Sequence, residues 1–424
     1  MLLAALTLAA APGAHAALAQ AKAPAPPAVS FEEKKLAEAP AGAKFEERSS
    51  FAPTGRKVVF AYREGDKHVV MLGSEKIGGY HYFDRPAWSA NGEHVALRLG
   101  NRIEPKKEKW WAYLDTKKIA EEDWIGLVEP SPDGSEAAYW INPGSKLDDQ
   151  GIYTGGKWFF VVGKNRGREW GEGYGLAENA YSRDGSKVAT CCIREGMSRV
   201  LVVEKKTEKL ITNDKHGPFL AIDSLAFAPD GKLVYGAQAT PEKSSRWLVF
   251  YGDEVYGKDL FSAGSPVLSP SGARIAYKSV TNGKIAMAVD HTRFSRDGDA
   301  LTSAVFSPDG KHVAYGISRG GTIDPTDAMA QDSEWSVKGG KWHLAVDNEV
   351  TSAAFDELRT PTFAADGKLV AFAGREGDRW FIVVGDKKSE PYDEVGAPAF
   401  SPDGKKVAFG ARKGSELWWK VWTP

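Results

Sequence analysis

The chain has 424 residues, and its 55 basic and 56 acidic side chains leave a net charge of −1. This balance excludes the broad positive field that draws proteins to nucleic acid or to an anionic membrane. Hydrophobic residues make up 42% of the sequence, which is ample for a core, while 45 glycines and 23 prolines indicate many turns between short elements. The composition therefore favours an all-β chain.

The first nineteen residues contain no Asp, Glu, Lys or Arg and consist mostly of Ala and Leu. Small-x-small triplets at 14–16 and 17–19 are typical of a cleavage site, so we interpret residues 1–19 as a secretory signal peptide. Residues 20–28 are rich in Ala and Pro and are expected to form a disordered spacer. We expect residues 29–424 to form a single domain, in a periplasmic or secreted bacterial protein.

Only two cysteines are present, Cys191 and Cys192, and adjacent cysteines very rarely pair with each other. The fold is therefore expected to stand without disulfides. Export is compatible with this, because a large packed domain needs no covalent cross-links.

One short phrase recurs nine times, with FSPDGKHVAY from Phe306 and FSPDGKKVAF from Phe400 as the clearest copies. Subtracting the numbers of successive glycines gives steps of 37 to 57 residues, which cluster near the forty-odd residues of one propeller blade. The nine glycines are Gly55, Gly92, Gly134, Gly185, Gly231, Gly272, Gly310, Gly367 and Gly404.

The chemistry of the phrase predicts a tight turn followed by a buried strand. A short polar residue precedes the glycine in all nine copies, and Pro stands before it in six. Pro presets φ, the polar side chain binds nearby backbone, and Gly takes a positive φ. The apolar run that follows, such as residues 407–409, has no polar face, which indicates a strand packed between two neighbouring sheets.

A second phrase places a Trp five residues before a Gly or Asp, with a buried strand such as residues 381–384 between them. An aromatic-Asp pair often follows, ahead of the next turn. Because these Asp residues recur at one place in the repeat, we interpret them as strand-end caps rather than as a ring of ligands. The Trp pairings are Trp110 with Asp115, Trp158 with Gly163, Trp247 with Gly252, Trp342 with Asp347 and Trp380 with Gly385; the aromatic-Asp pairs are Phe83-Asp84, Phe355-Asp356 and Tyr392-Asp393.

With the Trp-x-x-Val-Val strand behind them, these phrases resemble the WD40-like repeats of the TolB-type β-propeller family, from about residue 49 to the C-terminus. The Gly-His opening and Trp-Asp ending of true WD repeats are missing. The resemblance implies a closed ring of four-stranded antiparallel blades. In this family such a ring is usually a periplasmic or surface binding platform.

Nine phrases predict nine blades, with eight as the alternative, because propellers usually have four to eight blades. The Gly134 copy lacks the upstream aromatic residue and could belong to an elaborated loop instead. The last copy ends near Trp422, one strand short of a blade. We expect residues 29–36 to supply that outer strand and to close the ring.

We find no pattern that predicts a catalytic residue, a metal site or a cofactor. No two histidines have metal-ligand spacing, and neither a G-x-S-x-G nor a Walker-type motif is present. The glycine-rich run at 171–175 is interpreted as a flexible connection rather than a phosphate loop, and residues 296–299 as a turn rather than a calcium site.

Function is then expected in the loops, since propellers vary loops over a constant frame. If the tight turn joins the first and second strands, the second-to-third and fourth-to-first connections share the opposite face. The longest connections fall there, and they carry residue types that dominate binding hot spots, although their aromatic residues could simply pack their own loops. The predicted partner-binding residues are Trp124, Arg166, Arg168, Trp170, Tyr174 and Trp335.

Three functions are compatible with these observations. The leading hypothesis is an exported non-enzymatic β-propeller that binds a protein or a cell-envelope component, but neither nucleic acid nor the membrane interior, through its looped face. The alternative is a carbohydrate-active propeller, a polysaccharide hydrolase or lyase, whose carboxylates would converge at the central channel. A third hypothesis is a spacer within an export or surface assembly, for which flat loops of mixed charge are expected.

Overall fold

The computed structural model describes residues 28–45, 49–104, 106–149, 152–173, 179–204, 206–211, 217, 219–240, 246–260, 262–281, 284–293, 298–323 and 337–424. All the regular secondary structure in these ranges is β-strand, so the all-β prediction is confirmed for them. They contain no helix long and apolar enough to cross a membrane. The predicted signal peptide and residues 20–27 of the predicted spacer lie outside the described residues.

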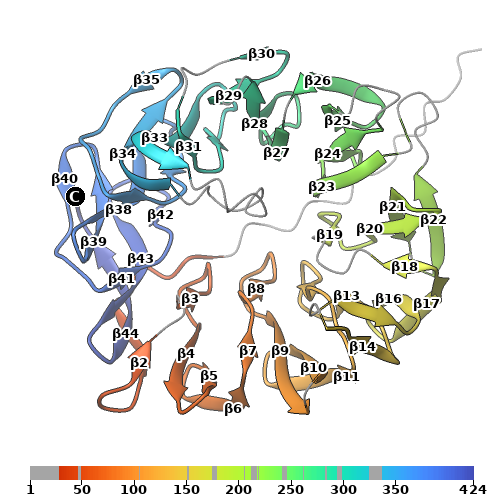
Figure 1. Ribbon diagram of the computed structural model, residues 1–424. Coiled ribbons are helices and arrows are strands. Elements are labelled where there is room, and N and C mark those ends of the chain that lie inside the picture. Colours follow the sequence, from red (N-terminus) through yellow and green to blue (C-terminus); the bar gives the residue numbers. More distant parts are fainter. Residues whose placement is uncertain are drawn as a thin grey trace, which may run out of the picture.

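The strands form small antiparallel sheets arranged in a ring (Figure 1). In one repeat, two short segments, β31 (Ala300–Leu301) and β32 (Val305–Phe306), both pair with β33 (Val313–Ile323). The sheet continues with β34 (Val337–Val346) and β35 (Glu349–Val350). This is a four-stranded propeller blade whose first strand is interrupted.

The other sheets follow the same plan, and several of them, like the sheet of β31 to β35, have their first strand nearer the centre of the ring than their fourth strand (Figure 1). From the N-terminal side they comprise β2 (Lys44–Phe45), β3 (Ser50–Phe51), β4 (Val58–Glu64), β5 (Lys67–Leu72) and β6 (Glu75–Tyr80); β7 (Tyr82–Phe83), β8 (Ala87–Trp88), β9 (Val95–Glu104), β10 (Lys107–Leu114) and β11 (Lys117–Glu122); and β12 (Glu129–Pro130), β13 (Ala137–Ile141), β16 (Trp158–Val162) and β17 (Asn165–Trp170), with the hairpin β14 (Ser145–Leu147) and β15 (Tyr153–Gly155) inserted.

The second half of the ring continues this series. Its sheets comprise β18 (Glu172–Gly173), β19 (Ala180–Tyr181), β20 (Lys187–Arg194), β21 (Met197–Glu204), β22 (Thr207–Ile211), β23 (Phe219–Phe227), β24 (Leu233–Ala239), β25 (Trp247–Tyr251) and β26 (Glu254–Leu260); β27 (Ser262–Leu268), β28 (Ile275–Thr281), β29 (Lys284–Val289) and β30 (Thr292–Arg293); β36 (Glu357–Leu358), β37 (Thr362–Phe363), β38 (Val370–Glu376), β39 (Arg379–Val384) and β40 (Lys387–Lys388); and β41 (Glu394–Val395), β42 (Ala399–Phe400), β43 (Val407–Lys413) and β44 (Glu416–Trp422), joined by β1 (Lys34–Glu38).

The repeat does not map onto nine separate sheets. Ser198 of β21 pairs with Phe219 of β23, so strands β18 to β26 form one continuous nine-stranded sheet that contains two copies of the phrase. The Gly134 copy, in contrast, forms a four-stranded sheet of its own, β12-β13-β16-β17, rather than a loop.

The predicted turn is confirmed in all nine copies. Each phrase glycine has a φ between 66° and 81°. Its N–H donates to the carbonyl three residues earlier at 2.8–2.9 Å, as from Gly310 to Ser307. In the same turn Asp309 accepts hydrogen bonds from the Ser307 hydroxyl at 2.6 Å and the Lys311 N–H at 3.1 Å, which lower the pKa of its carboxyl group to about 2. The glycine position therefore requires a left-handed backbone.

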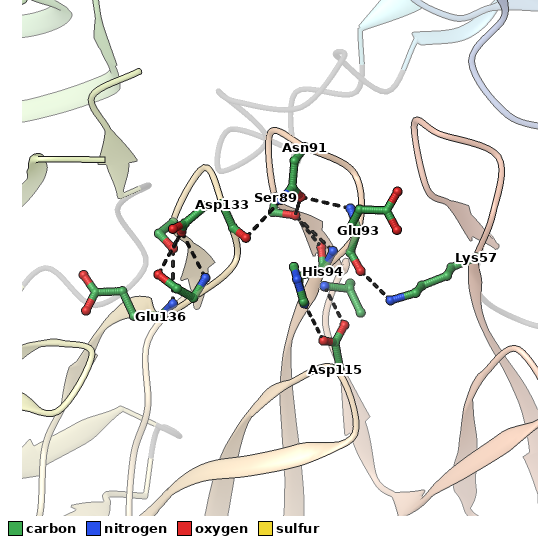
Figure 2. Close-up of polar contacts among 11 residues, drawn as sticks. Lys57, Ser89, Asn91, Glu93, His94, Asp115, Asp133 and Glu136 are labelled. Atoms are coloured by element: carbon green, nitrogen blue, oxygen red, sulfur yellow. Dashed lines mark hydrogen bonds and ion pairs between the residues drawn. The ribbon is translucent and has the colours of Figure 1, made fainter. Parts of the chain in front are cut away.

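Neighbouring turns are also joined to one another, as Figure 2 shows for three of them. Asn91 accepts hydrogen bonds within its own turn, from the Ser89 hydroxyl at 2.6 Å and the Glu93 N–H at 3.0 Å. Its side-chain amide donates to the Asp133 carbonyl of the next turn at 2.9 Å, and Lys57 of the preceding repeat donates to the Glu93 carbonyl. These contacts link adjacent sheets on the face of the ring that carries the nine glycine turns, here called the turn face.

The turn between the third and fourth strands explains the second phrase. Asp115 and Asp347 have φ values of 53° and 54°, at the position where other repeats have a glycine. The Asp115 carboxylate contacts His94 Nδ1 at 2.7 Å and accepts the Val95 N–H at 3.1 Å (Figure 2), and His312 lies 2.8 Å from Asp347 in the same way. The two histidines thus occupy half-exposed positions and support a turn.

The core lies between the sheets, as predicted from the runs without a polar face. Val407, Ala408 and Phe409 are fully buried although their side chains point to both sides of β43. At Gly410 two neighbouring sheets approach so closely that only glycine fits, because a Cβ there would lie 2.0 Å from the Phe51 ring. Cys191 and Cys192 form no disulfide, and both are buried in this core.

The two ends of the described chain pair with each other, as predicted. β1 pairs antiparallel with β44 and is the outermost strand of the sheet that contains the last repeat. It begins at Lys34 and ends at Glu38, slightly beyond the predicted range of 29–36. Trp419 of β44 packs against Gly55 of the first turn, and its indole N–H donates to the Ser30 carbonyl at 2.7 Å.

Removing this N-terminal strand should destabilise the whole ring. We expect a protein that lacks residues 1–45 to unfold about 5–10 °C below one that lacks only residues 1–28, because the edge of β44 loses its partner and the apolar side chains beneath β1 are exposed. Circular dichroism melting curves of the two proteins provide the measurement. Equal melting temperatures would contradict a closing role for β1.

Candidate binding site on the looped face

Antiparallel order sends alternate connections to opposite faces of the ring. One face carries the first-to-second and third-to-fourth turns described above. The other, here called the looped face, carries the second-to-third and fourth-to-first connections, which vary in length. Among the described residues, the connection from β13 to β16 carries an inserted hairpin, formed by β14 and β15.

On the looped face, an Asp at the end of one connection caps the second-to-third turn of its own repeat. The Asp356 carboxylate accepts the Gly377 N–H at 2.7 Å, and Asp393 accepts the Gly414 N–H at 2.6 Å. Asp123 does the same for the Gly144 N–H at 2.7 Å. The interpretation of these Asp residues as strand-end caps is confirmed for Asp356 and Asp393.

The same carboxylates bind a cation from the preceding sheet. Lys341, directly before Trp342, lies 2.5 Å from Asp356, and Arg379, directly before Trp380, pairs with Asp393. The Lys341 ammonium and the Gly377 N–H hold the pKa of the Asp356 carboxyl below its usual value. Each cap therefore ties two neighbouring sheets together. Asp84, the third predicted member, pairs instead with Arg98 on β9 of its own sheet.

A pocket of about 470 Å³ opens on this face between two such connections. One wall is the end of β17, from Arg168 to Gly171, and the other is the turn after β20, from Ile193 to Gly196. Two of the predicted partner-binding residues, Arg168 and Trp170, line it. The second wall carries Arg194 and Glu195, so side chains of both charges line the pocket together with Trp170 and Ile193.

Cation–π contacts hold the arginines of this region in place. The Arg168 guanidinium lies 4.1 Å from the centroid of the Trp170 ring, and its Nε lies 3.0 Å from Glu208. Arg166 lies 3.5 Å from the centroid of the Phe159 ring. The Arg168 side chain remains 54% exposed, so it can still meet a partner.

The predicted tryptophans are packed inward. Trp124 is 4% and Trp170 is 6% exposed, and both belong to one core cluster with Trp140 and Phe160. These two tryptophans therefore stabilise the fold, as in the alternative that the aromatic residues pack within the protein. Arg168 and Arg166 remain as the accessible members of the predicted set. Tyr174 and Trp335 lie outside the described residues.

Sequence reasoning did not find Arg194 and Glu195. Their turn contains neither an insertion nor an aromatic residue, so the sequence pattern does not indicate a binding site there. A weak signal existed, because Glu195 has a φ of 56° at a turn position where Gly377 and Gly414 have glycine.

The described residues contain no group of three or more His, Cys, Asp or Glu side chains placed to hold a metal ion. No family model matches the sequence, and no curated protein matches it.

Several solved structures resemble the chain at low scores. The Dos1 propeller is 11% identical with a TM-score of 0.44, over 80% of this chain and 92% of that one. A eukaryotic initiation factor is 11% identical with a TM-score of 0.45, over 84% and 89%. The β-propeller domain of the Trilobed protease from Pyrococcus furiosus is 12% identical with a TM-score of 0.39, over 73% and 99%. The propeller architecture itself rests on the strand order and the ring of sheets.

Because Trp170 is buried in a core cluster, we expect its side chain to stabilise the fold. We expect Trp170→Ala to lower the free energy of unfolding by about 3–5 kcal/mol, because a large cavity opens in the core cluster. Urea unfolding followed by tryptophan fluorescence measures the loss, and Arg166→Ala, at an accessible position, should cost less than about 1 kcal/mol. A Trp170→Ala protein as stable as the parent would show that the indole is not a core element.

Proposed function

We propose that this β-propeller is a platform that binds a protein partner on its looped face. The observation that carries the proposal is the difference between the two faces. The turn face repeats one tight turn nine times with nearly constant geometry, while the looped face carries connections of unequal length, an inserted hairpin and a pocket. A constant frame with variable loops on one side is the usual arrangement of binding scaffolds.

Exposed apolar residues on the looped face support a protein as the partner. Ile103 near the end of β9 is 50% exposed, and Ile152 in the β14–β15 hairpin is 55% exposed. Lys106 pairs with Asp149 across the two hairpins, and the Trp110 indole N–H donates to the Tyr153 hydroxyl at 2.7 Å. The hairpins therefore present their isoleucines from one connected surface, which suits an apolar contact with another protein.

Removing these side chains should weaken binding without affecting the fold. We expect Ile103→Ser combined with Ile152→Ser to reduce partner retention at least about tenfold, since hot-spot contacts each contribute more than about 1 kcal/mol. The assay is affinity capture of bacterial envelope proteins on the immobilised mature protein, with quantitative mass spectrometry. Val350→Ser combined with Leu369→Ser is the matched control, because these residues are 42% exposed near the opposite face. Equal retention by both double variants would refute the looped face as the binding surface.

We further propose that the protein is exported, that it binds a cell-envelope component, and that its nine repeats form a closed ring. The uncharged Ala- and Leu-rich segment at 1–19 and the resemblance to TolB-type repeats support export and an envelope partner. Nine equivalent turns and the β1–β44 pairing support the closed ring.

One preparation tests both properties. We expect the full chain expressed in a Gram-negative host to appear in the periplasmic fraction with a new N-terminus near residue 20, and its end-on electron-microscopy class averages to show nine spokes. Cytoplasmic retention of the uncleaved chain would argue against export. Eight spokes or an open arc would argue against the nine-bladed ring.

A further inference from the structure

The strand register defines one equivalent position in several repeats of the looped face. Trp342 forms a bridge to Phe355, and Trp380 forms the same bridge to Tyr392. The residue after each bridge is the capping carboxylate, Asp356 in one repeat and Asp393 in the next.

In the repeat that contains Gly185 the carboxylate is missing. Trp158 pairs with Trp170 in the same register, but the next residue is Gly171. The residue after Gly171 again has the same pairing as in the other repeat. Glu172 pairs with Ile193, just as Glu394, the residue after Asp393, pairs with Arg412. Gly171 therefore stands where the two repeats compared above have Asp356 and Asp393.

Both partners of the missing carboxylate are still present. Lys157 precedes Trp158 as Lys341 precedes Trp342, and it is paired with Glu169 at 3.0 Å instead of with a cap. The turn that the cap would close is Glu195-Gly196. Within the part of the chain that the structure describes, the Glu195 N–H makes no hydrogen bond, whereas the equivalent Gly377 and Gly414 N–H groups are capped.

Space for a carboxylate is also present. A Cβ added at Gly171 would meet nothing within 4 Å, and both Gly171 and Glu195 line the pocket of about 470 Å³. The indole N–H of Trp170, another lining residue, is buried without a hydrogen-bond partner. The pocket thus coincides with the vacated carboxylate position.

We propose that a carboxylate from an Asp or Glu side chain of the protein partner binds in this pocket. It accepts the Glu195 N–H and pairs with Lys157, as Asp356 does with Gly377 and Lys341. The inference rests on the proposed protein-binding function and names the chemistry of the partner.

The surrounding charges are compatible with this ligand. Arg168 and Arg194 line the pocket together with Glu169 and Glu195. Arg168 is already paired with Glu208, and Lys157 would exchange Glu169 for the incoming carboxylate. Binding would therefore replace the Lys157–Glu169 ion pair with a pair between Lys157 and the ligand. Because one exposed ion pair is exchanged for another, we expect an isolated carboxylate to bind weakly.

The test uses the peptide acetyl-Gly-Asp-Gly-amide, with acetyl-Gly-Asn-Gly-amide as the matched control. We expect the Asp peptide to shift the Glu195 amide resonance of the mature protein saturably in ¹H–¹⁵N TROSY spectra, with a Kd of about 1–10 mM. The neutral Asn peptide should produce no saturable shift. Equal responses to the two peptides, or none to either, would overturn the proposal.

Two variants test the position of the ligand. Gly171→Asp should place a carboxylate of the protein itself in the pocket, raise the melting temperature by about 1–2 °C and abolish the peptide-induced shift, whereas Gly171→Ala should keep it. Lys157→Ala should weaken peptide binding about tenfold and serves if Gly171→Asp fails to fold. Unchanged peptide binding by Lys157→Ala and by a folded Gly171→Asp would refute the site.

The outcome is distinguishable from that of the platform proposal. Partner capture that depends on Ile103 and Ile152 but is unaffected by Gly171→Asp, with no response to the Asp peptide, would refute the carboxylate site and leave the platform intact. An Asp-specific, Lys157-dependent shift without any captured protein would refute the platform and leave a site for small carboxylates only.

Discussion

The structure depends on sheets that are apolar on both faces and so cannot exist alone. Strand β43 shows the constraint, because Val407, Ala408 and Phe409 are all fully buried although they point to both sides of their sheet. Each sheet therefore needs a neighbour on either side, and the first sheet must meet the last. At the ends of the described chain, Trp419 packs on Gly55 and β1 adds to the edge of β44.

When the sheets stack around the ring, the ends of their strands lie on two opposite faces. The connections on these two faces are stabilised by different interactions. The turn face uses repeated backbone hydrogen bonds and short polar side chains. The looped face uses carboxylates such as Asp356 and Asp393, which join one sheet to the next. Where Gly171 replaces this carboxylate, the cation and the N–H that it would bind are retained beside a pocket. We therefore propose that a carboxylate of the protein partner binds where this structural pattern is interrupted.

Residue types predicted the general location of the candidate site better than its members. Arg168 and Trp170 do line the pocket, but Trp170 and Trp124 face the core. Aromatic side chains are equally suited to a core and to an interface, so their presence in a loop does not say which side they face. Arg194 and Glu195 were missed because they lie in a short turn that no insertion marks.

The sequence by itself determined the repeat, the nine left-handed glycine turns and the capping role of Asp356 and Asp393, because these depend on contacts within one repeat or on spacing along the chain. The incomplete last repeat also predicted that the N-terminal segment adds a strand there, as β1 does beside β44. Only the tertiary structure decided that two repeats share one continuous sheet and that Gly171 and Glu195 line one pocket. These contacts join residues far apart in the chain or in neighbouring repeats. They are set by how the sheets stack and pair around the ring, which local patterns do not encode.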